Sequence, residues 1–352
     1  MDSFAKVKKF LWFFAKLAIA GGIVAYLVLR NPEEIAASFR AFNYWWLIPA
    51  CAIYLGHILV CAWRWYRLTG MLNVQLSTFE ALSLTMQGNF FSLVIPGGAI
   101  GGDVVKMGVL SKRSKAGSKV EGAFTILMDR IIGMIALFLL ALVLLIPATP
   151  LLMKVELPQL PLTDTMRITG IIVLAGLCIA GLAASCVIFF HRRVEKLPLF
   201  GDLMHWGDRI THGMISRMTA ATDIYAKQWK ELAVLTIVSI FFVHLMTVAA
   251  FSCIMAGLGI TVPVLTLVTA VTIGNIAGLI PLCPGGIGGR DVVIITILAA
   301  GGVAIGDAKT GQLLYTATVL FFNLLGGVFF LFDPGRKITE ETLKKELEAS
   351  NG

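Results

Sequence analysis

The stretch GNFFSLVIPGGAIGGDVVKMG, residues 88–108, returns later in the chain as GNIAGLIPLCPGGIGGRDVV, residues 274–293. Aligned on Pro-Gly-Gly, the two stretches are offset by 188 residues and share seven identities over the ten ungapped positions 96–105 and 284–293. Asn89 and Asn275 match after a further slip of two residues. We interpret the two stretches as an internal repeat, because agreement of this length is hard to obtain by chance.

Each copy is predicted to break a helix. Proline lacks a backbone donor and clashes with the preceding turn, and adjacent glycines disfavour helix, so neither segment should cross a membrane as one continuous helix. Inside hydrocarbon the freed backbone groups still need partners, which places such a break inside protein or beside water. The alternative is a glycine-rich packing surface with a proline kink.

The composition is that of a polytopic helical membrane protein. Of the 352 residues 57% are hydrophobic and 14% are charged, and the mean hydropathy is +0.85. We predict an all-α membrane fold with about six full spans and two re-entrant broken-helix hairpins. The net charge of +8 does not indicate nucleic-acid binding, because the basic residues lie in short loops. The six cysteines lie in apolar segments without a CxxC pair and are interpreted as small buried hydrophobes.

Six apolar segments are long enough to span a bilayer. They are residues 10–29, 44–62, 123–146, 168–190, 232–257 and 313–332, and the hairpins occupy 79–110 and 262–300. The amphipathic stretch 200–227 is predicted to lie on the membrane surface, with the packed face of a cytoplasmic helix as the alternative. The aromatic and basic cluster from Trp63 to Arg67 is interpreted as an interfacial anchor.

The basic residues predict the orientation. If both termini are cytoplasmic and both hairpins re-enter, the outside loops hold only five of the 29 Lys and Arg residues, namely Arg30, Arg40, Lys154, Arg167 and Lys309. The chain would then be an inverted repeat, with an N-terminal half at 1–160, a C-terminal half at 161–335 and a short charged cytoplasmic tail at 336–352. That architecture is expected of alternating-access carriers, in which the broken helices meet near the midplane.

The two Pro-Gly-Gly hairpins and the pair Asp129–Arg130 resemble the flippase-like family. This family comprises the transmembrane region of lysylphosphatidylglycerol synthases and its stand-alone relatives, and the resemblance extends over about residues 11–332. It implies movement of a lipid with a bulky head group between leaflets: aminoacylated phosphatidylglycerol in the synthases, glycolipids or polyprenyl carriers in relatives. Because the sequence given ends at Gly352, we do not expect it to carry the aminoacyl-transfer domain of the synthases. The resemblance therefore leaves the identity of the lipid open. The pair is Asp-Arg where the family most often has Glu-Arg, and the charge pattern survives that change.

The candidate substrate site consists of the motif residues and the Asp-Arg pair. It contains Asn89, Pro96, Gly97, Gly98, Asp103, Lys106, Asp129, Arg130, Asn275, Pro284, Gly285, Gly286, Arg290 and Asp291. Arginine donors suit a phosphate, carboxylates suit an ammonium or sugar, and helix ends at the breaks add backbone donors for an anion. The alternative is that Asp129–Arg130 and Arg290–Asp291 are structural pairs that neutralise one another or charges of neighbouring helices.

No catalytic residue, metal or cofactor is expected. His57 and His244 are interpreted as core histidines on apolar spans, and His205 and His212 as solvated residues of the surface helix.

The sequence therefore predicts a lipid transporter of the cytoplasmic membrane of a bacterium or archaeon, and not an enzyme. Its expected partners are membrane lipids: anionic or aminoacylated phospholipids, or polyprenyl-phosphate glycolipids. Homo-oligomerisation and a separate lipid-modifying enzyme are left open, and nucleic acid is not expected. Two alternatives remain, a proton- or sodium-coupled carrier of a small organic anion and a membrane-embedded lipid-modifying enzyme.

Overall fold

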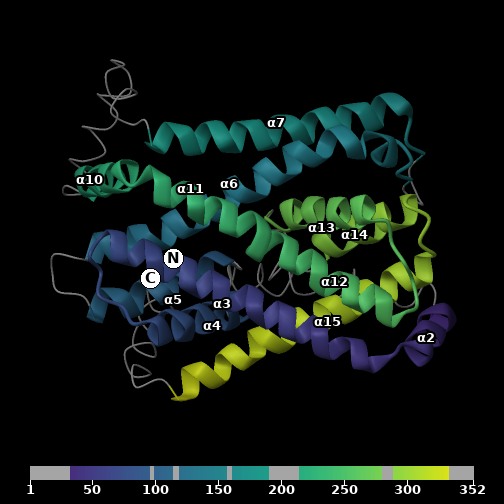
Figure 1. Cartoon of the computed structure of the whole chain (residues 1–352), viewed down its shortest axis with the longest axis horizontal. Helices are drawn as coiled ribbons and strands as arrows, with labels where there is room; N and C mark the ends of the chain where they lie inside the picture. Colours follow the sequence, from purple (N-terminus) through teal and green to yellow (C-terminus); the bar gives the residue numbers. More distant parts are fainter. Residues whose placement is uncertain are drawn as a thin grey trace, which may run out of the picture.

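The structure is a computed structural model of the chain and describes residues 32–95, 99–113, 119–156, 161–189, 214–279 and 288–332. Within these ranges every element is helical, which confirms the predicted fold class (Figure 1). Five segments are long and apolar enough to cross a membrane: Tyr44–Met71, Val120–Leu152, Asp164–Phe189, Trp229–Gly257 and Ile305–Phe332. They coincide with five of the six predicted spans. The remaining span, 10–29, lies outside the described residues.

Four of the spans are built on single α-helices. These are α3 (Leu47–Met71), which follows a short 3-10 turn at Tyr44–Trp46, α6 (Lys119–Leu152), α7 (Asp164–Phe189) and α15 (Ile305–Phe332). The fifth is composite and joins α11 (Trp229–Val238), a π-helical turn at Ser239–His244 and α12 (Leu245–Gly257). At 34 residues α6 is about 51 Å long, so it exceeds the roughly 30 Å hydrocarbon core and must tilt or project from it.

Each repeated motif extends over two separate helices. The first begins in α4 (Thr78–Val94) and ends in α5 (Ala99–Arg113), and the second begins in α13 (Val264–Gly278) and ends in α14 (Gly289–Ala300). These helices have 12 to 17 residues, fewer than the about 20 that a span needs. No continuous helix therefore crosses either motif, as predicted. Re-entry and the inverted repeat themselves remain predictions, and both Pro-Gly-Gly triplets lie outside the described residues.

Local sequence explains where the motif helices begin and end. At the start of α4, Ser77 and Glu80 form a capping box, in which the Ser77 hydroxyl accepts from the Glu80 amide and the Glu80 carboxylate accepts from the Ser77 amide. At its end, Ile95 is extended, as expected of the residue before Pro96. At the start of α14, Gly288 has φ of 97°, which a residue with a side chain rarely adopts.

The paired motif helices pack closely through glycine. A Cβ on Gly102 of α5 would lie 2.1 Å from the carbonyl oxygen of Gly88 on α4, so the two backbones touch. A Cβ on Gly326 of α15 would likewise lie 2.0 Å from the carbonyl oxygen of Met86 on the other side of α4. Small residues that let backbones approach are the usual means of joining helices in a membrane.

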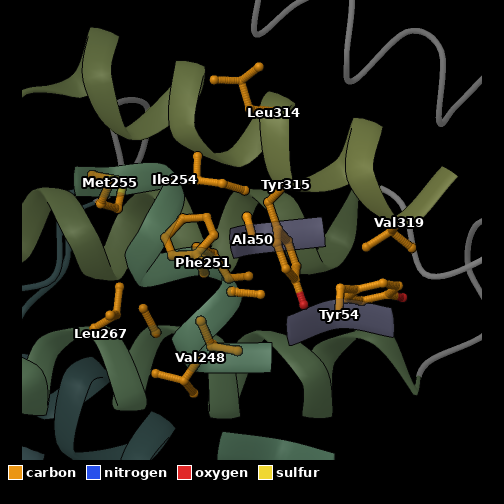
Figure 2. Close-up of a cluster of buried hydrophobic side chains, with 14 of the residues drawn as sticks. Ala50, Tyr54, Val248, Phe251, Ile254, Met255, Leu267, Leu314, Tyr315 and Val319 are labelled. Atoms are coloured by element: carbon orange, nitrogen blue, oxygen red, sulfur yellow. The ribbon is translucent and has the colours of Figure 1, made fainter. Parts of the chain in front are cut away.

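The largest hydrophobic core joins α3, α4, α12, α13, α14 and α15. Figure 2 shows Tyr315 of α15 between Phe251 of α12 and Tyr54 of α3. Both neighbouring rings meet Tyr315 edge to face, with centroids 5.3 Å and 6.3 Å away. In Figure 1 the α4–α5 pair and the α13–α14 pair lie in opposite halves of the long axis, while α3, α6 and α15 extend between the halves.

The predicted surface helix is described only in its second part, as α10 (Met214–Lys227). This part buries Ala221 and Tyr225. The Tyr225 hydroxyl donates to the carbonyl oxygen of Leu68 at 2.9 Å, and burial raises the pKa of Tyr225 well above its usual range, so the hydroxyl stays neutral. The described face of α10 is thus a packed one, and its position relative to the membrane surface remains a prediction.

Two assignments from the sequence need correction. Lys309, expected in an outside loop, lies inside α15 and is 5% exposed. In the cluster expected to anchor the interface, Trp63 and Arg67 are exposed, but Arg64 and Trp65 are buried in protein. Helical geometry explains why only part of the Trp63–Arg67 cluster is exposed. Neighbouring residues of α3 point in different directions, so only some of them can face the lipid.

Candidate substrate site

Arg130 and Asp103 form a two-point ion pair between α6 and α5. The Arg130 Nε donates to Asp103 Oδ2 at 2.8 Å and Nη2 donates to Oδ1 at 3.0 Å. This fork is the strong geometry of arginine with an oxyanion. The Arg130 side chain is nevertheless 46% exposed, whereas that of Asp103 is 15% exposed. Part of the Arg130 side chain therefore remains exposed, inside the candidate span Val120–Leu152.

Asp129 does not pair with its neighbour Arg130. Its Oδ1 accepts from Nε of Arg64 on α3 at 2.8 Å, and Nη1 of Arg64 donates to the Ser239 hydroxyl in the π-helical turn at 2.9 Å. Successive residues of a helix point about 100° apart, so Asp129 faces α3 while Arg130 faces α5. Asp129 and Arg130 therefore do not neutralise one another. Each pairs instead with a neighbouring helix, which the alternative of structural pairs also allowed.

Lys106 adds a third base to this region. It is 7% exposed, and its Nζ lies 4.9 Å from the centre of the Trp65 ring, a cation–π arrangement. The indole Nε1 of Trp65 donates to the Thr125 hydroxyl at 3.1 Å, which fixes the ring. Gly88 leaves room for the lysine stem, because a Cβ there would lie 2.6 Å from Lys106 Cε.

We call Arg64, Asp103, Lys106, Asp129 and Arg130 the first cluster. It contains three basic side chains and two carboxylates, so with all five ionised one positive charge is in excess. An excess base is costly in a membrane unless an anion compensates it.

The second cluster surrounds Asp291 near the start of α14. Its Oδ1 accepts from Gln312 Nε2 at 2.7 Å, from the Thr316 hydroxyl at 3.2 Å and from Arg290 Nε at 3.3 Å, and its Oδ2 accepts from the Gly288 amide at 3.1 Å. Arg290 also donates to the Thr316 hydroxyl at 3.1 Å. The carboxylate thus satisfies the first turn of its own helix and binds α14 to α15. This cluster is balanced in charge, unlike the first.

A family model for the lysylphosphatidylglycerol synthase transmembrane region matches residues 13–327 of the chain. This match covers most of the 352 residues. The chain belongs to this family. A search among curated proteins found no relative that matches. Membership confirms the resemblance seen in the motifs and fits a lipid-related flippase role in a membrane.

The structure places the other predicted site residues of this family member as follows. Asn89 and Asn275 are half-buried on α4 and α13, and the Asn89 carbonyl accepts from the Ser92 hydroxyl at 2.6 Å. Pro96, Gly97, Gly98, Pro284, Gly285 and Gly286 lie outside the described residues. The hydrogen-bond partners of Asp103 and Asp291 have no member in common among the described residues.

The two core histidines hold helices together. His57 Nδ1 lies 3.0 Å from the carbonyl oxygen of Val243, and His244 Nε2 lies 3.0 Å from that of Gly133. These contacts join the π-helical turn to α3 and to α6. His205 and His212 lie outside the described residues, and in the part of the chain that is described no group of three His, Cys, Asp or Glu could hold a metal ion.

The sequence analysis missed four residues that belong to the two clusters or bind to them: Arg64, Ser239, Gln312 and Thr316. Arg64 was hidden in the Trp63–Arg67 segment, which has the composition of an interfacial anchor. Its spacing of seven residues, two helical turns, from His57 places both on one face of α3 and was an available signal. Gln312 and Thr316 form an i,i+4 polar pair on an apolar span, which also signals an inward face.

Proposed function

We propose that the chain moves a lipid with a phosphate-bearing head group between the two leaflets of a membrane, by alternating access. The proposed lipids are anionic or aminoacylated phospholipids, or polyprenyl-phosphate glycolipids. Family membership supports a lipid substrate rather than a small organic anion. The repeated hairpins support alternating access, because carriers with inverted repeats bind substrate where broken helices meet.

The observation that carries this proposal is the exposure of Arg130. Arg130 lies inside the candidate span Val120–Leu152. A charged side chain within a span is costly and is by default a functional candidate. Asp103 occupies one edge of the guanidinium, while the side chain remains 46% exposed. Arginine binds phosphate through the same fork that it offers to a carboxylate, so a lipid phosphate can share Arg130 with Asp103 or replace it.

The excess charge of the first cluster supports an anionic head group in particular. A phosphodiester carries one negative charge, which matches the one uncompensated base among Arg64, Lys106 and Arg130. An aminoacylated head group would add an ammonium, for which Asp103 becomes available once the phosphate has taken its place on Arg130. The same two groups thereby serve both charges of a zwitterionic or aminoacylated head group.

The direct test is head-group movement in vesicles reconstituted with the purified protein. Arg130→Gln alone would leave Asp103 unpaired, so the variant to use is the neutral pair Asp103→Asn/Arg130→Gln, which removes both charges together. We expect this pair to accumulate and to lose movement of a labelled phosphatidylglycerol. Arg40→Gln, an exposed position on α2 (Pro32–Ala41), is the matched control and should retain full movement.

Full activity of the neutral pair would contradict the proposal. Native mass spectrometry of the protein extracted gently from its own membrane would identify the lipid. Retention of a small organic anion in place of a phosphate-bearing lipid would instead favour the carrier alternative.

A further inference from the structure

Arg64 connects three helices through a single buried guanidinium. Its side chain is 6% exposed, and it donates both to Asp129 on α6 and to Ser239 in the composite span. Gly133, one turn after Asp129, leaves room for it, since a Cβ there would lie 3.3 Å from Arg64 Nη1. A buried arginine with two directed hydrogen bonds fixes the relative position of the helices that carry its partners.

This bridge supplies the partner of the Asp129 carboxylate. Asp129 is 16% exposed, so its carboxylate requires a partner. Asp129 is adjacent to Arg130 in α6, so an unpaired Asp129 carboxylate would place a second negative charge next to Arg130. By pairing with Asp129, Arg64 neutralises that charge. Arg130 then has only Asp103 as its carboxylate partner among the described residues.

The second end of the bridge is an unusual piece of helix. Ser239–His244 forms a π-helical turn, a conformation that is rare and concentrated at functional sites. Three side-chain contacts hold this turn to its neighbours, through Ser239 with Arg64, the Val243 carbonyl with His57, and His244 with the Gly133 carbonyl. Of these three contacts, the hydrogen bond from Arg64 to Ser239 joins the turn directly to a side chain of the first cluster.

We propose that Arg64 is a positioning residue, which holds Asp129 against the π-helical turn and so reserves the Arg130 guanidinium for a phosphate-bearing lipid. The proposal rests on the proposed function, and it assigns to Arg64 control of head-group selectivity rather than contact with the lipid. A conformational change in the π-helical turn would act through Ser239 and Arg64 on Asp129. It would thereby alter the charge next to Arg130, where the proposed lipid phosphate binds.

The test measures selectivity, because a merely structural arginine would not change it. Native mass spectrometry would give the affinities for phosphatidylglycerol and for a diacylglycerol with the same acyl chains, which lacks the phosphate. Arg64→Lys keeps the charge but loses the fork, and Ser239→Ala removes only the far end of the bridge. Arg67→Lys is the matched control one turn later on α3, where the arginine is exposed and pairs with Glu231.

We expect Arg64→Lys to lower the preference for phosphatidylglycerol by about tenfold, the loss of one charge-assisted hydrogen bond. Ser239→Ala should lower it by a smaller factor, and Arg67→Lys should leave it unchanged. Hydrogen exchange without lipid should rise at residues 239–244 in Arg64→Lys and Ser239→Ala alone, because the turn loses a contact in each.

Other outcomes overturn the proposal. An unchanged preference in Arg64→Lys and Ser239→Ala, or an equal loss of affinity for both lipids, would make Arg64 structural only. If the unsubstituted protein showed no preference for phosphatidylglycerol, the proposed function itself would be contradicted. The role proposed for Arg64 would then be contradicted as well. The exchange data separate these cases, because they report the bridge without any lipid.

Discussion

At the scale of single residues, the two aspartates of the repeated motifs have different surroundings. Asp103 is bound by a base of another helix, and that base is itself partly exposed. Asp291 accepts four hydrogen bonds, of which two come from its own helix start and two from α15. Equivalent sequence positions therefore have different surroundings, the first next to a partly exposed arginine side chain and the second in a buried hydrogen-bond network.

This difference predicts opposite consequences of one substitution. Asp103→Asn should accumulate normally and change lipid movement, because Arg130 loses its charged partner but remains partly solvated. Asp291→Asn should lower stability by about 1–3 kcal/mol, since an amide cannot accept from all four donors and leaves buried groups unsatisfied. The thermal midpoint in detergent and head-group movement in vesicles measure the two effects. Equal midpoints for both variants would contradict the assignment of Asp291 to a structural network.

At the scale of elements, glycine contacts decide how the motif helices pair. Gly102 of α5 touches the backbone of α4 at Gly88, and Gly326 of α15 touches it at Met86. At both places the obstacle is a backbone oxygen, which cannot move aside as a flexible side chain can. The helix α4 is thus held between two neighbours without space for a Cβ on either.

Gly102→Leu should therefore separate α4 from α5. We expect a loss of at least about 1–3 kcal/mol, the usual cost of overpacking, and a lower thermal midpoint. Gly176→Leu on α7 is the control, because a Cβ there meets nothing within 4 Å. A Gly102→Leu protein as stable as the Gly176→Leu protein would show that the helices can separate without cost.

The glycines at the breaks make a separate prediction. Replacing Gly97 and Gly98, or Gly285 and Gly286, by leucine should abolish transport while the protein still inserts, because the break needs a backbone that only glycine adopts easily. Membrane insertion and head-group movement would be measured for each double variant. Full activity of the Gly285→Leu/Gly286→Leu protein would mean that the motif is only a packing surface.

At the scale of the whole molecule, the inverted repeat makes a prediction about sidedness. Lys154 follows α6 and is exposed, and Lys230 lies at the start of α11 and is exposed. With cytoplasmic termini, the positive-inside rule places Lys154 outside and Lys230 inside. Lys309 cannot serve as a reporter, because it is buried in α15.

Single-cysteine labelling in intact cells tests this orientation, in a protein without the six native cysteines. Lys154→Cys should react with an impermeant reagent at once, and Lys230→Cys only after permeabilisation. The opposite result would reverse the orientation, and labelling of both from outside would contradict the inverted repeat.

The sequence by itself determined the helical membrane class, five of the spans and the two places where helix stops, because apolar length and proline-glycine breaks are local properties. It also placed the embedded charges Asp103, Lys106, Asp129, Arg130, Arg290 and Asp291 in the chain. Only the tertiary structure decided how these charges pair. Asp129 and Arg130 are adjacent in sequence but face different helices, and the partner of Asp129 is Arg64, 65 residues away. Pairing depends on which faces of distant helices meet, and no local pattern in α3 or α6 specifies that.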